Sequence, residues 1–456
     1  MEEGLPWAEP AWLGSLDSPY YNDSHRKLQA YARKFYDENV IPHMLEWEEA
    51  GDVPASAREA YLKSGLSLVD VPTEYRPAGG SSGDGGGATV AGIPLEELDI
   101  FHRIILTDEA SRVEGGVATA LAGGANAIGL PPVLRHGTEA QKRRWLPGVC
   151  EGTVSFCLGV TEPSGGSDVG NIRTTARKVH GSGDADDDES DYYVVNGTKK
   201  WITGAPWATH MTTAVRTGGG SPGPAGLSLL VIPLSSPGVS IERIRNSGQN
   251  AGGASFVRMR DVRVPARSHL LGREGAGFGY AVRNFNGERL VMSVVCNRKA
   301  RTCLGLALAY ARERETFGSP LVAHQVIRHK LVHVAREVEA HWARIEQIAY
   351  HLKMNNDDGD GDGADVAGAI AMAKITGGRV LELAAREAQQ VMGGVAYQRA
   401  GPGGGGRVEQ IVRDLRMMVV GGGSEEILGD LAFREEMKMA RRKARERERV
   451  KAKANL

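Results

Sequence analysis

The sequence has few cysteines, no excess of charge and no long apolar run. Only 4 of its 456 residues are cysteine, and their spacing suits no metal site. This profile is typical of a protein with free thiols from a reducing compartment. The net charge of −1 does not indicate nucleic acid or an anionic membrane as a partner. No apolar run reaches the ~20 residues that a membrane-spanning helix needs, and the acidic N-terminal residues do not resemble a signal or transit peptide.

Several well-known binding motifs are also missing. No glycine cluster continues as Gly-Lys-Ser/Thr, and no histidine pair has the spacing of a zinc protease. The glycines of 275–279 lack the full dinucleotide-binding spacing and a surrounding βαβ unit. Asp358, Asp360, Asp362 and Gly363 match the opening of a calcium-binding EF-hand loop, but its twelfth position is Ala369 instead of the required glutamate. We therefore expect neither a Rossmann site nor a metal ion.

Glycine is abundant, with 60 residues, about twice the usual share of ~7%. Much of the excess lies between segments with periodic apolar patterns, so we expect expanded surface loops there. These loops are Gly79–Gly92, Gly181–Asp191, Gly218–Gly226, Asn355–Asp365 and Gly401–Gly406.

The apolar pattern changes twice along the chain. It has helical spacing from Ser18 to Pro147, with prolines that interrupt it, and again from about Gly275 to Ala400. Between them, short β-rich segments favour a small barrel or sandwich. These segments are Tyr192–Asn196, Met211–Arg216, Leu227–Pro233, Val239–Ile244 and Phe256–Val264. We predict an N-terminal helical domain (1–150), a central β-domain (151–268), a helical bundle (269–434) and a charged tail (435–456).

The stretch Phe156–Asp168 reads as an apolar strand that ends in a turn rich in glycine, proline and serine. Such a turn lets backbone N–H groups approach a ligand closely. Thr161, Ser167 and the later Trp201–Thr203 add hydroxyls and one large flat ring. The combination suits a planar cofactor with polar edges, although composition alone is equally compatible with an ordinary hairpin loop.

Six separated motifs, taken in order, resemble those of the acyl-CoA dehydrogenases, a family of FAD-dependent flavoproteins. The resemblance spans about Ser18 to Arg434, and it implies a mainly helical fold with a central β-domain and a C-terminal four-helix bundle. The motifs are Val160-Thr-Glu-Pro-Ser-Gly-Gly-Ser-Asp168, Asn196-Gly-Thr-Lys-Lys-Trp-Ile-Thr203, Arg314-Glu-Thr-Phe-Gly318, His324-Gln325, Gln390-Val-Met-Gly-Gly394 and Arg413-Asp-Leu-Arg416.

The resemblance implies a role for specific residues in binding FAD. One group would line and cover the flavin ring, a second would hold the pyrophosphate and adenine across a subunit boundary, and a third would come from the neighbouring subunit. Such sharing implies a homodimer or homotetramer. A bidentate guanidinium such as that of Arg314 suits phosphate. The groups are Leu158, Val160, Thr161, Ser167, Trp201, Ile202 and Thr203; Arg314, Thr316, Phe317 and Gln325; and Gln390, Gly393 and Gly394, with Ser424 and Glu426 as further FAD contacts.

The catalytic base departs from the commonest pattern of the family. Many members carry a glutamate in a Tyr-Glu-Gly-Thr motif, and this chain has Gly422 at that position. Isovaleryl- and long-chain-type members place the base in a Glu-Arg-Leu motif on a helix, which Glu288 and Arg289 match here. Glu288 is therefore the expected base, with a surface ion pair as the alternative and Glu426 as a rival base. Phe285, Arg289 and Ser167 would contact substrate, and the Gly422 N–H would bind the thioester carbonyl.

The expected activity is FAD-dependent dehydrogenation of an acyl-CoA to a trans-2-enoyl-CoA. The electrons would pass to a separate acceptor such as electron-transferring flavoprotein. A peroxide-forming oxidase and an inactive flavin-binding scaffold are the alternatives. The charged tail is expected to be a solvated helix with a disordered end, with nucleic-acid or membrane contact as a minor alternative. Its end, Lys453-Ala-Asn-Leu456, resembles a peroxisomal signal, so peroxisome or cytoplasm is expected before mitochondrion.

Overall fold

The computed structural model describes residues 4–14, 16–76, 89–181, 191–218, 223–355 and 366–454. The EF-hand-like aspartates and most of the expected loop 355–365 lie outside these residues, as do Asn455 and Leu456 of the possible targeting signal. Contacts divide the chain into two compact units. We call Met1–Tyr20, Asp99–Ile104 and Phe285–Leu456 the helical unit, and Tyr21–Leu98 and Ile105–Asn284 the mixed unit.

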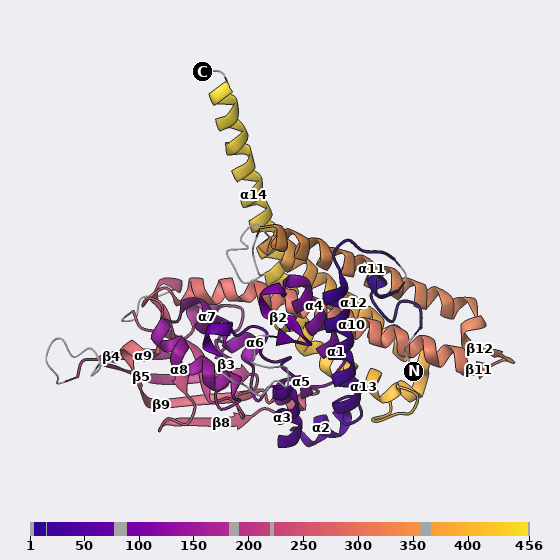
Figure 1. Ribbon diagram of the computed structural model, residues 1–456, viewed down its shortest axis with the longest axis horizontal. Coiled ribbons are helices and arrows are strands. Elements are labelled where there is room, and N and C mark those ends of the chain that lie inside the picture. The colour runs from indigo at the N-terminus through magenta and orange to yellow at the C-terminus, as the bar shows by residue number, and fades with distance from the viewer. Residues whose placement is uncertain are drawn as a thin grey trace. The chain divides into compact units, whose positions relative to one another are not determined.

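The N-terminal half of the mixed unit is helical, as the sequence predicted. Asn22 and Thr138 each cap a helix by accepting hydrogen bonds from backbone N–H groups of the first turn, which have no partner within the helix. Pro147 lies inside α8, so the helix continues through a proline that we expected to interrupt it. The helices are α1 (Asp23–Asn39), α2 (Met44–Ala50), α3 (Ala55–Lys63), α5 (Val117–Leu121), α6 (Asn126–Gly129), α7 (Pro131–His136) and α8 (Glu139–Cys150), with α4 (Ile100–Ala110) shared between the units (Figure 1).

The mixed unit also contains an eight-stranded sheet with the order β10-β7-β6-β4-β5-β9-β8, in which β3 pairs with β6. Each of the five strand segments expected from the sequence forms a strand, and β5 extends six residues past its expected end at Asn196. One face of the sheet packs on a core of valine, isoleucine and methionine side chains. The strands are β3 (Phe156–Gly159), β4 (Thr175–Val179), β5 (Tyr192–Ile202), β6 (His210–Arg216), β7 (Leu227–Pro233), β8 (Val239–Arg243), β9 (Ser255–Pro265) and β10 (Leu270–Leu271).

Long helices form the helical unit. Leucine, valine and alanine side chains from these helices make its core, and small residues on α12 let the helices approach closely. The helices are α10 (Gly277–Glu313), whose first residues belong to the mixed unit, α11 (Gln325–Met354), α12 (Ala367–Met392), α13 (Gly405–Val420) and α14 (Glu425–Ala454). The order helical, β, helical is confirmed, while α14 continues as helix through the expected tail to Ala454.

No helix in the described ranges is long and apolar enough to cross a membrane.

Candidate active site

The two segments that the sequence suggested as a cofactor wall lie side by side. The turn after β3 is closed by reciprocal backbone hydrogen bonds between Glu162 and Gly165, at 3.0 and 3.1 Å. The N–H of Lys200, near the end of β5, donates to the carbonyl of Thr161 at 2.8 Å. Residues some forty positions apart are therefore brought together by the backbone itself.

A buried ion pair, which was not predicted from the sequence, connects the two segments of this wall. Lys199 Nζ lies 2.8 Å from a carboxylate oxygen of Glu162 and also donates to the Val160 carbonyl at 3.2 Å. The Glu162 carboxylate accepts further bonds from the N–H groups of Arg173 and Thr174. Burial alone would raise the pKa of Glu162, but Lys199 and these hydrogen bonds outweigh it and lower that pKa. Both residues belong to the recognised motifs, which was the available signal.

Trp201 stands at an irregularity in β5. The pairing of β5 with β9 shifts register between Lys199 and Ile202, and Trp201 adopts a left-handed φ of 64°. Such a φ is unfavourable for a large side chain and often marks a functional position. The bulge leaves the indole 50% exposed, with the Lys200 ammonium 4.7 Å from its ring centre. A flat aromatic surface is thus held outward at the edge of the wall.

Polar groups on the same two segments are available to a ligand. Thr161, Ser167 and Thr203 are not fully buried, and within the described ranges their hydroxyls make no hydrogen bond. Val160 and Ile202 are different, because their side chains are buried and only their backbone groups could face a ligand. The wall therefore offers one exposed ring and three free hydroxyls, which suits a planar ligand with polar edges.

The predicted pyrophosphate-binding residues lie around a small hairpin of the helical unit. β11 (Glu315–Thr316) pairs with β12 (Ser319–Pro320), and Phe317 and Gly318 form the turn with left-handed φ values of 52° and 75°. Phe317 is 99% exposed, its ring edge-on to His324 at 6.2 Å. Arg314 is also exposed, so its guanidinium is accessible to an anion.

Gln325 and Gln390 lie at the same end of a helix pair. Lys330 of α11 forms an ion pair with Glu387 of α12. The His341 ring, later on α11, donates to the carbonyl of Ala373, which comes earlier on α12. These contacts make the two helices antiparallel, which puts the start of α11 beside the end of α12. Gln325, Gln390, Gly393 and Gly394 are all exposed at that end.

The loop that carries Gly422 is tied directly to the helix that carries Glu288. Arg289, the next residue on α10, is buried and donates from Nε to the Gly422 carbonyl at 3.0 Å. The Arg289 guanidinium also lies over the Phe285 ring at 5.6 Å. Burial lowers the pKa of Arg289, and the negative charge of Glu288 opposes that shift. Gly422 and the helix turn that carries Glu288, the two positions that the sequence compared for a base, therefore belong to one local structure.

The two acids after this loop have their own contacts. Glu425 lies 2.7 Å from the Arg379 guanidinium. Hydrogen bonds from its own backbone N–H and the Ser424 hydroxyl lower the pKa of Glu426. Glu426 is exposed at the start of α14, where a negative charge is favourable. These contacts favour a role for Glu426 at the start of the helix over that of a rival base.

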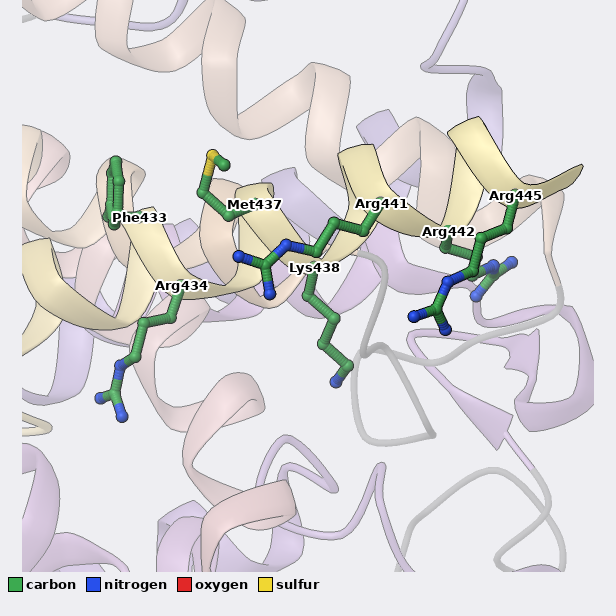
Figure 2. A pocket seen from close by; sticks show the side chains of 7 residues that line it. All are labelled: Phe433, Arg434, Met437, Lys438, Arg441, Arg442 and Arg445. Atoms are coloured by element: carbon green, nitrogen blue, oxygen red, sulfur yellow. The ribbon is translucent and has the colours of Figure 1, made fainter. Parts of the chain in front are cut away.

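A separate groove follows the exposed side of α14 (Figure 2). A single helix forms it, most of its side chains are cationic, and none of the predicted site residues lines it, so we assign neither flavin nor substrate to it. Its lining residues are Phe433, Arg434, Met437, Lys438, Arg441, Arg442 and Arg445.

Comparison with known proteins identifies the family. Models of acyl-CoA dehydrogenases match in sequence order: the N-terminal domain over residues 22–153, the middle domain over 157–262 and the C-terminal domain over 275–436. The chain belongs to the acyl-CoA dehydrogenase family. It is 38% identical over 438 residues to acyl-CoA dehydrogenase apdG of Emericella nidulans, which covers 95% of this chain and 96% of that protein.

Solved structures agree with this assignment. A probable acyl-CoA dehydrogenase from Mycobacterium abscessus is 32% identical, with a TM-score of 0.75, and the match covers 91% of this chain and 99% of that one. A Bacillus anthracis acyl-CoA dehydrogenase complexed with FAD is 24% identical, with a TM-score of 0.76 over 92% of this chain and 68% of that one, and shares the fold.

FAD is the cofactor of this family and therefore of this chain. The wall fits the flavin part of that cofactor, because the exposed Trp201 ring can cover a planar group and the free hydroxyls of Thr161 and Ser167 can bind its polar edge. The activity of the family is flavin-dependent dehydrogenation of acyl-CoA-like substrates.

Proposed function

We propose that this enzyme converts an acyl-CoA thioester into a trans-2-enoyl-CoA, with Glu288 as the base that removes the α-proton. The observation that carries this proposal is the hydrogen bond from Arg289 to the Gly422 carbonyl at 3.0 Å. It places the helix turn of Glu288 against the loop that lacks the usual glutamate. Bound FAD would supply the acceptor for the hydride that leaves Cβ.

The residues of this chain prepare the substrate for that step. Glu288 is half-buried on this turn of α10, and a carboxylate held against the substrate can act as a general base. The Gly422 N–H donates to the thioester oxygen, where negative charge develops as the α-proton leaves. Phe285 and Arg289 border the same turn of α10, and we assign them to substrate contact.

Replacing Glu288 tests the base. We expect Glu288→Gln to retain FAD but to slow flavin reduction by an acyl-CoA about 10²–10⁴-fold, the range that general bases contribute. The measurement is anaerobic loss of visible flavin absorption after mixing with a panel of acyl-CoAs of different length and branching, which also defines the substrate. Glu313→Gln, at the exposed end of the same helix, is the matched control. Unchanged reduction in Glu288→Gln would exclude Glu288 as the base.

The same purified protein distinguishes a dehydrogenase from an oxidase and from an inactive scaffold. We propose electron-transferring flavoprotein as the acceptor, so turnover should depend on an added acceptor. Hydrogen peroxide formed at the turnover rate without an acceptor would identify an oxidase instead. Protein that binds no FAD, or whose bound flavin no acyl-CoA reduces, would support an inactive scaffold.

We infer a homodimer or homotetramer with shared FAD sites. Arg314, Phe317, Gln325 and Gln390 are all exposed, so a second subunit or a shared FAD could contact them. The molecular mass of the FAD-loaded protein in solution tests the assembly. We also propose a peroxisomal or cytoplasmic location, which imaging of the protein with a free C-terminus would test.

A further inference from the structure

A buried lysine holds the loop between α13 and α14, residues 421–424. Lys374 of α12 is 2% exposed. Its Nζ donates to the Val419 carbonyl and, at 2.8 Å, to the Gly423 carbonyl. Together with Arg289, which holds the Gly422 carbonyl, it fixes both ends of a segment that has glycine at three successive positions. The segment has φ values of 71° at Gly422 and 119° at Gly423, which glycine permits among many other conformations, so the glycines alone do not fix this shape.

Lys374 is a buried cation that contacts no carboxylate in the part of the chain that the structure describes. No ion pair involves it within the described ranges, whereas Lys330, which contacts the same α12 helix, pairs with Glu387. A buried ammonium is costly unless it is paired, and a cation held only by carbonyls is therefore uncommon. Burial and the positive charge of Arg289 lower the pKa of Lys374, while Cys296 and Glu425 oppose that shift. Such groups occur more often at functional sites than in ordinary cores.

The contacts leave one backbone donor of the loop free. The Gly421 N–H donates to the Met417 carbonyl at 2.8 Å, and the Gly423 N–H donates to the Val420 carbonyl at 3.3 Å. Within the described ranges, the Gly422 N–H has no acceptor. This is the same N–H that the proposed function assigns to the thioester oxygen.

We propose that Lys374 is a positioning residue of the reaction, which rests on the function proposed above. By holding the carbonyls of Val419 and Gly423, Lys374 orients the loop so that the Gly422 N–H remains available to the thioester oxygen. Its positive charge also favours the negative charge that develops on this oxygen, because electrostatic interactions act strongly in a site with little water. Lys374 acts through the loop and does not touch the substrate.

The test is Lys374→Met, which keeps the length of the side chain and removes its charge and donors. We expect kcat to fall about 10–100-fold, less than the 10²–10³-fold loss of a complete oxyanion donor, with KM changed less than about twofold. FAD content should stay at the parent level. Lys330→Met, which removes the paired lysine that contacts the same helix, should leave kcat near that of the parent. Lys374→Arg, which keeps the charge, should recover part of the rate.

A bound analogue separates positioning from a merely structural role. A 3-thia-acyl-CoA has an acidic α-proton, and its deprotonated form gives a long-wavelength charge-transfer band with oxidised flavin. In Lys374→Met, the pH at which this band appears should rise by about one unit, because the enolate loses a favourable charge. An unchanged titration, or an equal loss of rate in Lys330→Met, would overturn the proposal.

Failure of the proposed function has a different result. In that case the parent protein itself would show no flavin reduction with any acyl-CoA. If Lys374→Met cannot be purified with FAD, the titration in Lys374→Arg decides: a pH within about 0.3 unit of the parent value supports the role of charge, and a full-unit rise contradicts it.

Discussion

At the scale of single residues, Arg289, next to Glu288, donates to the Gly422 carbonyl. The sequence predicts a departure from the family pattern at Gly422 and a replacement base at Glu288, and both stay predictions. It could not predict Lys374, because that residue is one of many lysines in a helical pattern and its partners lie 45 and 49 positions later. Glu162 and Lys199 were missed for a similar reason, since only the folded chain shows that the two are buried together.

Gly422 offers a direct test of where a base can act. A Cβ added there would meet only the Arg289 Cγ, at 3.7 Å, so a side chain has room. We expect Gly422→Glu to restore flavin reduction in the Glu288→Gln background by about tenfold, a fraction of what a well-placed base supplies. The left-handed φ should lower the free energy of unfolding by about 1–2 kcal/mol.

Gly422→Ala in the same background is the control, because it has the same strained φ and no carboxylate. Recovery in both double variants would show that the effect does not come from a transferred base. No recovery in Gly422→Glu, in protein that still binds FAD, would place this position out of reach of the α-carbon.

At the scale of elements, β-rich composition predicted the strands well but not the bulge in β5. The apolar run Leu227–Pro233 was expected to be a strand and forms β7 with the same bounds. Composition missed the last six residues of β5, because this part of the strand carries glycine and successive lysines. The register shift before Trp201 depends on the pairing with β9, and pairing between distant segments leaves no periodic signal in either one.

Trp201→Gly distinguishes the backbone strain at Trp201 from the proposed role of its ring in FAD binding. Glycine accepts a φ of 64° freely, so the FAD-free protein should unfold within about 1 kcal/mol of the parent or be slightly more stable. FAD should bind at least about tenfold more weakly, because the exposed ring that would cover the flavin is lost. Thermal unfolding of the FAD-free protein and titration with FAD measure the two effects. Unchanged FAD affinity would remove Trp201 from the flavin wall.

At the scale of the whole molecule, the order of helical and β segments was predictable because it depends on local periodicity and on motifs that occur in sequence order. Chain-distant polar contacts were not predictable in the same way, and buried histidines are the clearest case. His136, His210, His269 and His341 are spread over both units, and burial lowers the pKa of each to about 4. Nothing in their sequence neighbourhoods distinguishes them from exposed histidines.

His341 shows why these rings must stay neutral. The Asn297 amide donates to its Nδ1 at 3.1 Å, and its Nε2–H donates to the Ala373 carbonyl at 2.9 Å. With a proton on Nδ1, that N–H and the Asn297 N–H would face each other as two donors without an acceptor between them, inside the helical unit. The ring is 1% exposed, so water cannot replace the lost acceptor.

These histidines should make the enzyme sensitive to acid at moderate pH. In the unfolded chain a histidine binds a proton near pH ~6.5, whereas these rings bind one only near pH 4. The unfolded state therefore holds more protons between these values, and stability is lost as the pH falls from about 6.5 to 4. For His341 and His269, the two most buried, the loss should approach roughly 3 kcal/mol each at pH 4. Thermal unfolding of the FAD-loaded protein between pH 7.5 and 4 would measure this as a steady fall in the midpoint. A midpoint that stays constant from pH 7 down to 5 would show that the four rings do not control acid stability.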